Sequence, residues 1–218
     1  MISVNTTTQI FAKEGWNHIV LMLMVFIFSY AISFLPWLFF ALFIFTLFLY
    51  RNPERIQEED DELCFVAPVD GKVTYIAKVQ LHDGSEVLKV VIKKTLLDVG
   101  IIRAPMALTI SDLKVRKGLS LPNSSPLSSV LGERSILTCK GKFADVKMII
   151  NTGRFSRKIE IFKTLGNLKV GERFAYLGDG DVILLLPLDA RVKVSLNDEV
   201  KAGMSVLGYF AYKVNDDK

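Results

Sequence analysis

The feature that most constrains this chain is a long apolar run near its start that contains no ionisable side chain. From Ile19 to Tyr50 the sequence has no Asp, Glu, Lys, Arg or His, and its polar groups are a few hydroxyls and one indole. As one continuous α-helix these 32 residues would be about 48 Å long, whereas the hydrocarbon core of a bilayer is roughly 30 Å thick. The run is long enough to enter a membrane and too long for one straight span.

Pro36 lies near the middle of the run and predicts a break in it. Proline lacks an amide donor and disfavours helical geometry in the residue before it, so we expect two short helices, at about Ile19–Ser33 and Trp37–Tyr50. Such a pair fits a hairpin that dips into the membrane, and it also fits one long kinked span. Lys13 precedes the run and Arg51 follows it. Positive residues on both flanks favour a hairpin whose two ends are cytoplasmic.

A secretory signal peptide is the alternative explanation of the run. It requires a basic start, an apolar core of about 7–15 residues and a small-residue cleavage site. Here the apolar stretch is much longer, no basic residue lies between Met1 and Ala12, and the run ends in Tyr50-Arg51-Asn52-Pro53. We therefore expect a retained membrane anchor.

The rest of the chain is long enough for one compact domain. Composition divides the sequence into a tail (1–18), the apolar hairpin (19–50), an acidic linker (51–62) and a domain (63–218). The formal net charge is +4, which suits a domain near an anionic leaflet but is too weak to indicate nucleic acid as a partner. Cys64 and Cys139 lie far apart without metal-ligand spacing. They agree with a reducing compartment, and no metal site is expected.

Short runs rich in Val, Ile, Phe and Leu recur through the domain between Gly, Asp and Asn turns, while helical periodicity is scarce. Many short strands at this spacing predict a mainly β domain. Short helices are expected only around Thr95–Val99 and within Ser120–Gly132. The expected strands are Leu63–Ala67, Lys72–Val79, Val87–Ile92, Leu108–Val115, Ile136–Cys139, Asp145–Asn151, Arg157–Lys163, Glu172–Leu177, Val182–Leu186, Arg191–Ser195 and Ser205–Tyr212.

Two segments, one near each end of the domain, suggest a particular β architecture. Residues 66–73 form an extended run, a tight Asp70-Gly71 turn and a second strand, and residues 197–207 form a polar turn, a Gly203 corner and a strand. Paired with each other, they resemble the two halves of a barrel-sandwich hybrid, as in lipoyl and biotinyl domains. We therefore expect the domain to have barrel-sandwich-hybrid character.

Six segments of the chain match, in order, the motifs of one protein family. They are Leu49–Arg55, Ala67–Val73, Leu97–Pro105, Gly132–Ser135, Asn151–Ile159 and Gly171–Phe174. They resemble R-[DN]-P-x-R after an aromatic pair, S-P-A-D-G-x-V, F-D-V-H-V-N-R-A-P, N-E-R-N, Q-I-A-G-x-x-A-R-R-I and the approach to F-G-S-R in the short, membrane-bound phosphatidylserine decarboxylases. One such motif is weak evidence, but six in order cover nearly the whole chain from about Trp16.

The resemblance implies a carbon–carbon lyase that makes its own cofactor. Members of this family cleave their own backbone at a Gly-Ser bond, and the serine becomes a pyruvoyl group. That group forms a Schiff base with the substrate amine and accepts electrons during decarboxylation. Self-cleavage requires a hydroxyl nucleophile and a base, and in the family an Asp and a His act with the serine in the manner of a hydrolase triad.

This chain keeps only the Asp of those three positions. Asp70 matches the family's Asp, Gly100 stands in place of the motif His, and Gly180 stands in place of the processed Ser. No Ser, Thr or Cys lies between Arg173 and Pro187. The pyruvoyl cofactor is therefore not expected to form, and the chain is predicted to be a pseudoenzyme in which Asp70 is vestigial.

Three of these features have competing explanations. Asp70 is also explained as a turn residue that bonds its own backbone. The stretch Gly178-Asp179-Gly180-Asp181 offers two carboxylates, too few ligands for a cation site, so we interpret it as a turn. Gly84-Ser85 is the only Gly-Ser pair in the chain, and we expect it at a hairpin tip, where processing would split the domain near its start.

A basic stretch is the candidate lipid-binding element. The stretch is interleaved with apolar residues, as expected for a strand that contacts phosphate headgroups, because Arg offers two donors to one phosphate. Its basic residues are Arg154, Arg157, Lys158 and Lys163, and its apolar residues are Phe155, Ile159, Ile161 and Phe162. An amphipathic strand with a solvated outer face explains the pattern equally well.

Three functions compete on this evidence. The first is a non-catalytic member of the decarboxylase family, at the cytoplasmic membrane with its β domain on the cytoplasmic side. It would act in phospholipid metabolism, with membrane phospholipids and a phospholipid-synthesis enzyme as candidate partners. The second is an active decarboxylase with a non-standard processing site, and the third is a membrane-anchored barrel-sandwich adaptor. The sequence does not predict the oligomeric state. The missing hydroxyl favours the first function.

Overall fold

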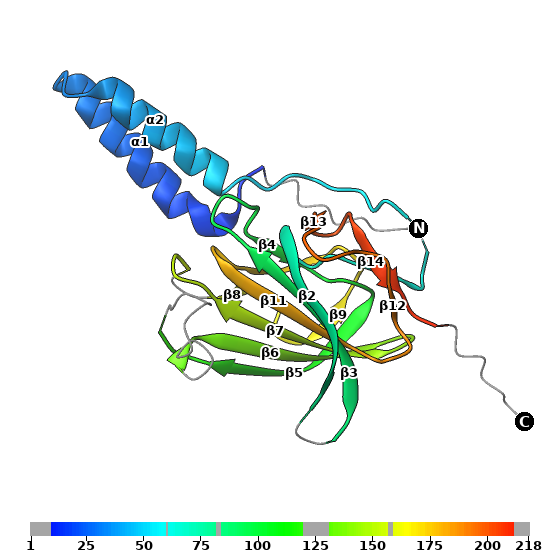
Figure 1. Ribbon diagram of the computed structural model, residues 1–218. Helices are drawn as coiled ribbons and strands as arrows, with labels where there is room; N and C mark the ends of the chain where they lie inside the picture. The colour runs from blue at the N-terminus through cyan, green and yellow to red at the C-terminus, as the bar shows by residue number, and fades with distance from the viewer. Residues whose placement is uncertain (1–9, 60, 82–83, 120–130, 157–158, 212–218) are drawn as a thin grey trace, which may run out of the picture. The chain divides into compact units, whose positions relative to one another are not determined.

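The computed structural model describes residues 10–59, 61–81, 84–119, 131–156 and 159–211. The chain divides into two compact units, Met1–Glu54 and Arg55–Lys218. The first is a helical hairpin, and the second is rich in β-strands (Figure 1).

Two helices make up most of the first unit. A short 3-10 helix, η1 (Lys13–Gly15), leads into α1 (Trp16–Ala31), and α2 (Pro36–Leu49) follows. The two long helices lie side by side in Figure 1, with the ring centroids of Phe26 and Phe40 5.5 Å apart. The apolar run is thus divided into two helices, as expected. Pro36 is the first residue of α2, where its missing amide donor would have had no helical partner in any case.

The side chains of this hairpin are largely exposed although most of them are apolar. A helix that is apolar on all sides is typical of a buried or lipid-facing segment. The segment Lys13–Ala31 is long and apolar enough to cross a membrane, and α2, with 14 residues, is shorter. The entry of the hairpin into a membrane stays a prediction.

The second unit consists of short strands. They are β1 (Cys64–Val66), β2 (Gly71–Gln80), β3 (Glu86–Lys94), β4 (Ile101–Arg103), β5 (Leu108–Arg116), β6 (Arg134–Gly141), β7 (Asp145–Thr152), β8 (Glu160–Ile161), β9 (Gly166–Leu168), β10 (Arg173–Tyr176), β11 (Gly180–Leu186), β12 (Arg191–Val192), β13 (Glu199–Val200) and β14 (Val206–Tyr209). An eight-stranded sheet has the order β13–β2–β3–β11–β7–β6–β5–β9. Two three-stranded sheets have the orders β1–β14–β12 and β4–β10–β8. The mainly β class is confirmed.

The two segments that were expected to pair with each other do lie together. Lys72 of β2 is the register partner of Glu199 of β13, and the Ala67 amide donates a hydrogen bond to the Ser205 carbonyl over 2.9 Å. Barrel-sandwich character stays a prediction, because the pairing of two terminal segments occurs in many β architectures.

One row of register partners crosses seven strands of the large sheet close to one of its ends. The row is Arg116, Arg134, Asn151, Asp181, Lys93, Lys72 and Glu199, on β5, β6, β7, β11, β3, β2 and β13. Register partners point to the same face of a sheet, and here it is the outer face, because the next residues along four of the strands, Ser135, Ile150, Val182 and Ile92, are buried. We name this end of the sheet the site end.

The core of the second unit lies on the inner face of the large sheet. Val73, Ile92, Val182 and Ile150 of four neighbouring strands are fully buried there, and Phe65 of β1 packs into the same cluster. A core this closely packed holds the ends of the strands, and the turns that join them, in fixed positions.

Two expectations about local structure were wrong. The segment around Thr95–Val99 is a turn and not a helix, because the Asp98 carboxylate accepts hydrogen bonds from the Thr95 amide and hydroxyl, each over 2.7 Å. The strands β4, β9 and β13 were not expected, since two or three residues show no readable alternation. The helix expected within Ser120–Gly132 falls mainly on residues 120–130, outside the described residues.

Candidate functional site

The three positions that were predicted to correspond to a processing triad lie at the site end of the β domain. Gly180 begins β11 and is the register partner of Lys94 on β3. Asp70 precedes β2, which is the next strand beside β3. Gly100 follows the turn after β3, and its carbonyl accepts the Leu177 amide over 2.8 Å. The fold therefore brings positions 70, 100 and 180 to one end of neighbouring strands.

Gly180 has a backbone that leaves no space for a side chain. Its φ is 151°, a region that favours glycine. A Cβ atom at this position would overlap the carbonyl oxygen of Asn151 and lie 3.0 Å from the Gly153 nitrogen. Both neighbours are backbone atoms of the adjacent strand β7 and the turn after it, so they cannot move aside as a flexible side chain would.

Gly100 lies against an aromatic ring. A Cβ atom here would be 2.6 Å from Cζ of Tyr176 and closer still to its Cε2 atom. Tyr176 is held in this position by β10, where it is the register partner of Ile101. The tyrosine ring occupies the space that a histidine at position 100 would need.

Asp70 is bound by two fixed partners. Arg55 donates to both carboxylate oxygens, with Nη2 2.6 Å from Oδ2, and the Ala202 amide donates to Oδ1 over 2.8 Å. The side chains of Arg55 and Asp70 are 10% and 11% exposed. This is the geometry of a bidentate, largely buried ion pair. Asp70 thus links the segment before β1 to the turn after β13, and it does so through partners other than its own turn.

A buried lysine adjoins the same position, and sequence reasoning missed it. Lys94 is fully buried, and its ammonium donates to three backbone carbonyls: Thr95 over 2.8 Å, Asp98 over 3.0 Å and Gly178 over 2.7 Å. A buried cation is tolerated only when its donors are satisfied. The pair Lys93-Lys94 gave no signal, because two lysines at a strand end are usually both solvated.

The Gly178–Asp181 stretch is a turn that organises its neighbours. The Asp179 carboxylate accepts the Phe155 amide over 3.2 Å, and the Asp179 carbonyl accepts the Gly153 amide over 2.8 Å.

Among the described residues, no group of three or more His, Cys, Asp or Glu side chains is placed to hold a metal ion. At Gly84-Ser85, the alternative processing site, the Leu81 amide donates to the Ser85 carbonyl over 2.8 Å, as in a hairpin tip.

The basic stretch is only partly described. Arg154 is exposed, and its guanidinium carbon lies 5.8 Å from the centroid of the Phe155 ring. Arg157 and Lys158 lie outside the described residues. The expected role of all three in lipid binding stays a prediction.

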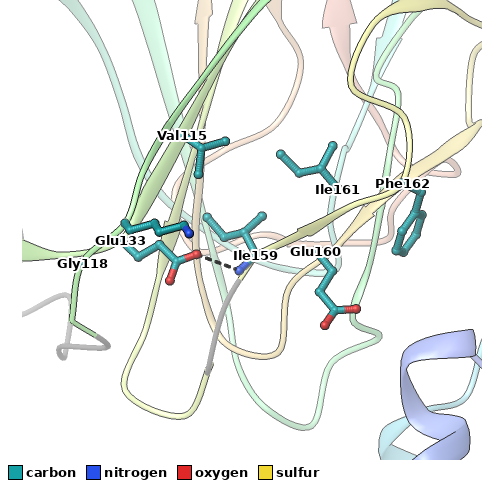
Figure 2. A pocket seen from close by; sticks show the side chains of 8 residues that line it. Val115, Gly118, Glu133, Ile159, Glu160, Ile161 and Phe162 are labelled. Atoms are coloured by element: carbon teal, nitrogen blue, oxygen red, sulfur yellow. Dashed lines mark hydrogen bonds between the residues drawn. The ribbon is translucent and has the colours of Figure 1, made fainter.

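A surface pocket of about 590 Å³ opens at the site end, between the large sheet and β8. In Figure 2 the Glu133 carboxylate lies beside Ile159, whose amide donates to Oε1 over 3.2 Å. Glu160 on the pocket wall is the register partner of Tyr176. The lining residues are Val115, Lys117, Gly118, Glu133, Ile159, Glu160, Ile161 and Phe162.

The residues at the site end do not fit a pyruvoyl group derived from a serine. Such a group begins as a hydroxyl-bearing side chain, and position 180 has neither a hydroxyl nor space for a Cβ atom. The space beside Gly100 is filled by Tyr176, and Asp70 is held by Arg55. We interpret the site end as a set of rigid turns without open space at positions 100 and 180.

Comparison with known proteins identifies the family. The family model described as "Phosphatidylserine decarboxylase" matches residues 42–208. A phosphatidylserine decarboxylase proenzyme of Geobacter sp. (strain M21) is 32% identical over 176 residues, which are 78% of this chain and 80% of the relative. Proenzymes of the same name from Syntrophotalea carbinolica and Carboxydothermus hydrogenoformans are 28% and 29% identical. The alignments cover 93% and 90% of this chain, and 89% and 94% of those relatives.

Proposed function

The chain belongs to the phosphatidylserine decarboxylase family, and we propose that within this family it is a membrane-anchored member that is neither self-processed nor catalytic. It acts in phospholipid metabolism by binding membrane lipid or a partner enzyme. The observation that carries the proposal is position 180. The chain has no Ser, Thr or Cys between Arg173 and Pro187, and the backbone at Gly180 leaves no space for a side chain.

The chemistry leaves no substitute for the missing hydroxyl at this position. Self-cleavage begins when an oxygen or sulfur nucleophile attacks the preceding carbonyl. Neighbouring Asp179 and Asp181 offer carboxylates, and a carboxylate cannot be converted to a pyruvoyl group by elimination. The Asp179 carboxylate also accepts the Phe155 amide.

Membrane anchoring is supported by the first unit. Its helices carry mostly apolar, exposed side chains, and Lys13–Ala31 meets the length and hydropathy of a membrane-crossing helix. Lys13 and Arg51 flank the apolar run, which favours a cytoplasmic location for both ends and for the β domain that follows.

The decisive experiment is the intact mass of the full chain purified from its membrane, together with labelling by borohydride. We expect one polypeptide of 24.5 kDa without a carbonyl that borohydride reduces. The Geobacter proenzyme, purified in parallel, is the control for detection of processing. Two fragments, with the smaller one beginning in a keto acid, would contradict the proposal.

The same measurement tests the alternative processing site. Cleavage at Gly84-Ser85 would divide the chain after residue 84 and would be abolished by Ser85→Ala, whereas the proposal expects both proteins to remain one uncut polypeptide. Lipid binding is tested separately with liposomes. Selective binding to anionic lipid that falls for Arg154→Ala supports a lipid-binding role, and binding without headgroup preference supports the adaptor function.

A further inference from the structure

The turns at the site end form one continuous surface because hydrogen bonds join each turn to the next. The turns are 95–98, 177–179, 153–156 and the paired segments 117–119 and 131–133. The joining bonds run from the Lys94 ammonium to the Asp98 and Gly178 carbonyls, from the Gly153 amide to the Asp179 carbonyl, from the Thr152 amide to the Glu133 carbonyl, and from the Leu119 amide to the Leu131 carbonyl.

This surface carries large apolar side chains that point into solvent. Phe155 is 67% exposed and Leu97 is 54% exposed, and Leu119 and Leu131 are also exposed. Leu97 and Phe155 lie in two of the turns, and Leu119 and Leu131 lie on the two paired segments between β5 and β6. At the opposite end of the sheet, Leu188 is the one exposed large hydrophobic residue among the described residues of the turns. Exposed apolar residues gathered on one face of a domain indicate an interaction surface.

The charges of the surface are arranged in an asymmetric way. Its basic side chains, Arg116, Lys117 and Arg154, are exposed. Three carboxylates of the same turns bind the backbone instead: Asp98 accepts the Thr95 amide, Asp179 accepts the Phe155 amide and Glu133 accepts the Ile159 amide. The face therefore presents apolar side chains among cations.

We infer that this surface, defined by Leu97, Leu119, Leu131 and Phe155, lies against the lipid bilayer. The apolar side chains enter the boundary between headgroups and acyl chains, and the surrounding cations meet phosphates and anionic lipids. The chemistry fits a lipid surface better than an acidic protein partner, because a protein partner would supply carboxylates to the cations but no acyl layer for four separate apolar side chains. The inference rests on the membrane anchoring in the proposed function.

The test measures the depth of single nitroxide labels on the full chain in nanodiscs of phosphatidylcholine with a minority of anionic phosphatidylglycerol. Labels are placed through Leu97→Cys, Phe155→Cys and Leu188→Cys, and through Phe40→Cys in the hairpin. Native Cys64 and Cys139 are buried, and burial raises the pKa of the Cys139 thiol to about 12. The unsubstituted chain, treated in the same way, gives the background labelling.

We expect the labels at 97 and 155 to collide more with oxygen than with a water-soluble nickel complex, and the label at 188 to show the reverse. The inference is overturned if 97 and 155 behave like 188. It is also overturned if both are shielded from oxygen and nickel alike, which would indicate a protein contact. A label at 40 in lipid with 97 and 155 in water rejects this inference alone, whereas a label at 40 in water rejects the anchoring itself. Melting temperatures of the labelled proteins check that each variant is folded.

Discussion

The ring of Tyr176 lies against Gly100, where the first side-chain atoms of any other residue at position 100 would be. The two residues are 76 positions apart in sequence, and they meet because β4 and β10 are neighbouring strands of one sheet. A histidine introduced at position 100 would therefore collide with the tyrosine ring.

We expect Gly100→Ala to lower the free energy of unfolding by about 1–3 kcal/mol, because the added methyl group overpacks the ring of Tyr176. In a double-mutant cycle with Tyr176→Ala, the penalty of the methyl group should become smaller, with a coupling energy above about 0.5 kcal/mol. Urea unfolding in mild detergent measures all four proteins. Additive effects would show that the ring does not occupy this space.

Replacing Gly180 by Ser tests whether the missing hydroxyl is the sole defect. We expect Gly180→Ser to remain one polypeptide and to lose about 2–4 kcal/mol of stability, since the new Cβ atom meets the Asn151 carbonyl and the backbone at this φ is strained for a non-glycine residue. Intact mass and thermal unfolding are the measurements. Gly178→Ala is the matched control, because its Cβ atom would be 3.6 Å or more from its neighbours. Efficient cleavage of Gly180→Ser would refute the steric argument.

The buried pair of Arg55 and Asp70 should be a major contributor to the stability of the β domain. Asp70→Asn leaves the Arg55 guanidinium largely buried without a charged partner, and we expect a loss of about 3–5 kcal/mol. The control is Asp112→Asn in the exposed pair with Lys114, whose charged atoms are 3.7 Å apart, where the change should stay within about 0.5 kcal/mol. Equal effects of the two substitutions in chemical unfolding would show that Asp70 has no special structural role.

Lys94 and Lys93 are adjacent lysines in opposite environments. Lys94→Met removes the donor shared by three backbone carbonyls, and we expect a loss of about 2–4 kcal/mol, because buried acceptors are left without partners. Lys93→Met changes an exposed side chain, and its effect should stay within about 0.5 kcal/mol. Thermal unfolding of the two variants compares them directly. A similar melting temperature for both would contradict the buried position of Lys94.

The stability of the β domain should fall in acid partly through Glu59. Hydrogen bonds from Lys193 and from the Tyr209 hydroxyl lower the pKa of Glu59 below its usual value of 4.5. A carboxylate whose pKa is lowered by folding stabilises the folded state above the unfolded pKa and loses that contribution as the pH falls through the folded value. The melting-temperature advantage of the wild type over Glu59→Gln should therefore shrink as the pH falls below 4.5. A difference that does not change with pH would exclude this role of Glu59.

Several elements of the fold followed from the sequence because their signals are local. The break at Pro36, the two apolar helices and most of the strands of the β domain depend on periodicity and turn residues within a few positions. The strands β4, β9 and β13 carry no such signal, since each has only two or three residues and exists through its partner. The turn at Thr95 was mistaken for a helix, because the side-chain bonds of Asp98 compete with helical ones.

The features of the candidate site also fall into those that the sequence indicated and those that it did not. The motifs led to the prediction that Gly100 and Gly180 stand in place of the family's histidine and serine, and it stays a prediction. The partner of Asp70 could not be recognised from the sequence, although Arg55 belongs to one of the matched motifs. Nothing in the sequence indicated that Lys94 is buried or that Tyr176 fills the space beside Gly100.

The sequence by itself determined two properties of composition: an apolar run without charges, and a stretch from Arg173 to Pro187 without a hydroxyl of Ser or Thr and without a thiol. Folding cannot add an atom that the chain lacks, so these conclusions needed no coordinates. Only the tertiary structure decided that Gly180 leaves no space for a side chain, that Tyr176 fills the space beside Gly100 and that exposed apolar side chains gather at the site end. These are contacts between segments far apart in the chain, and they depend on which strands pair and in what register.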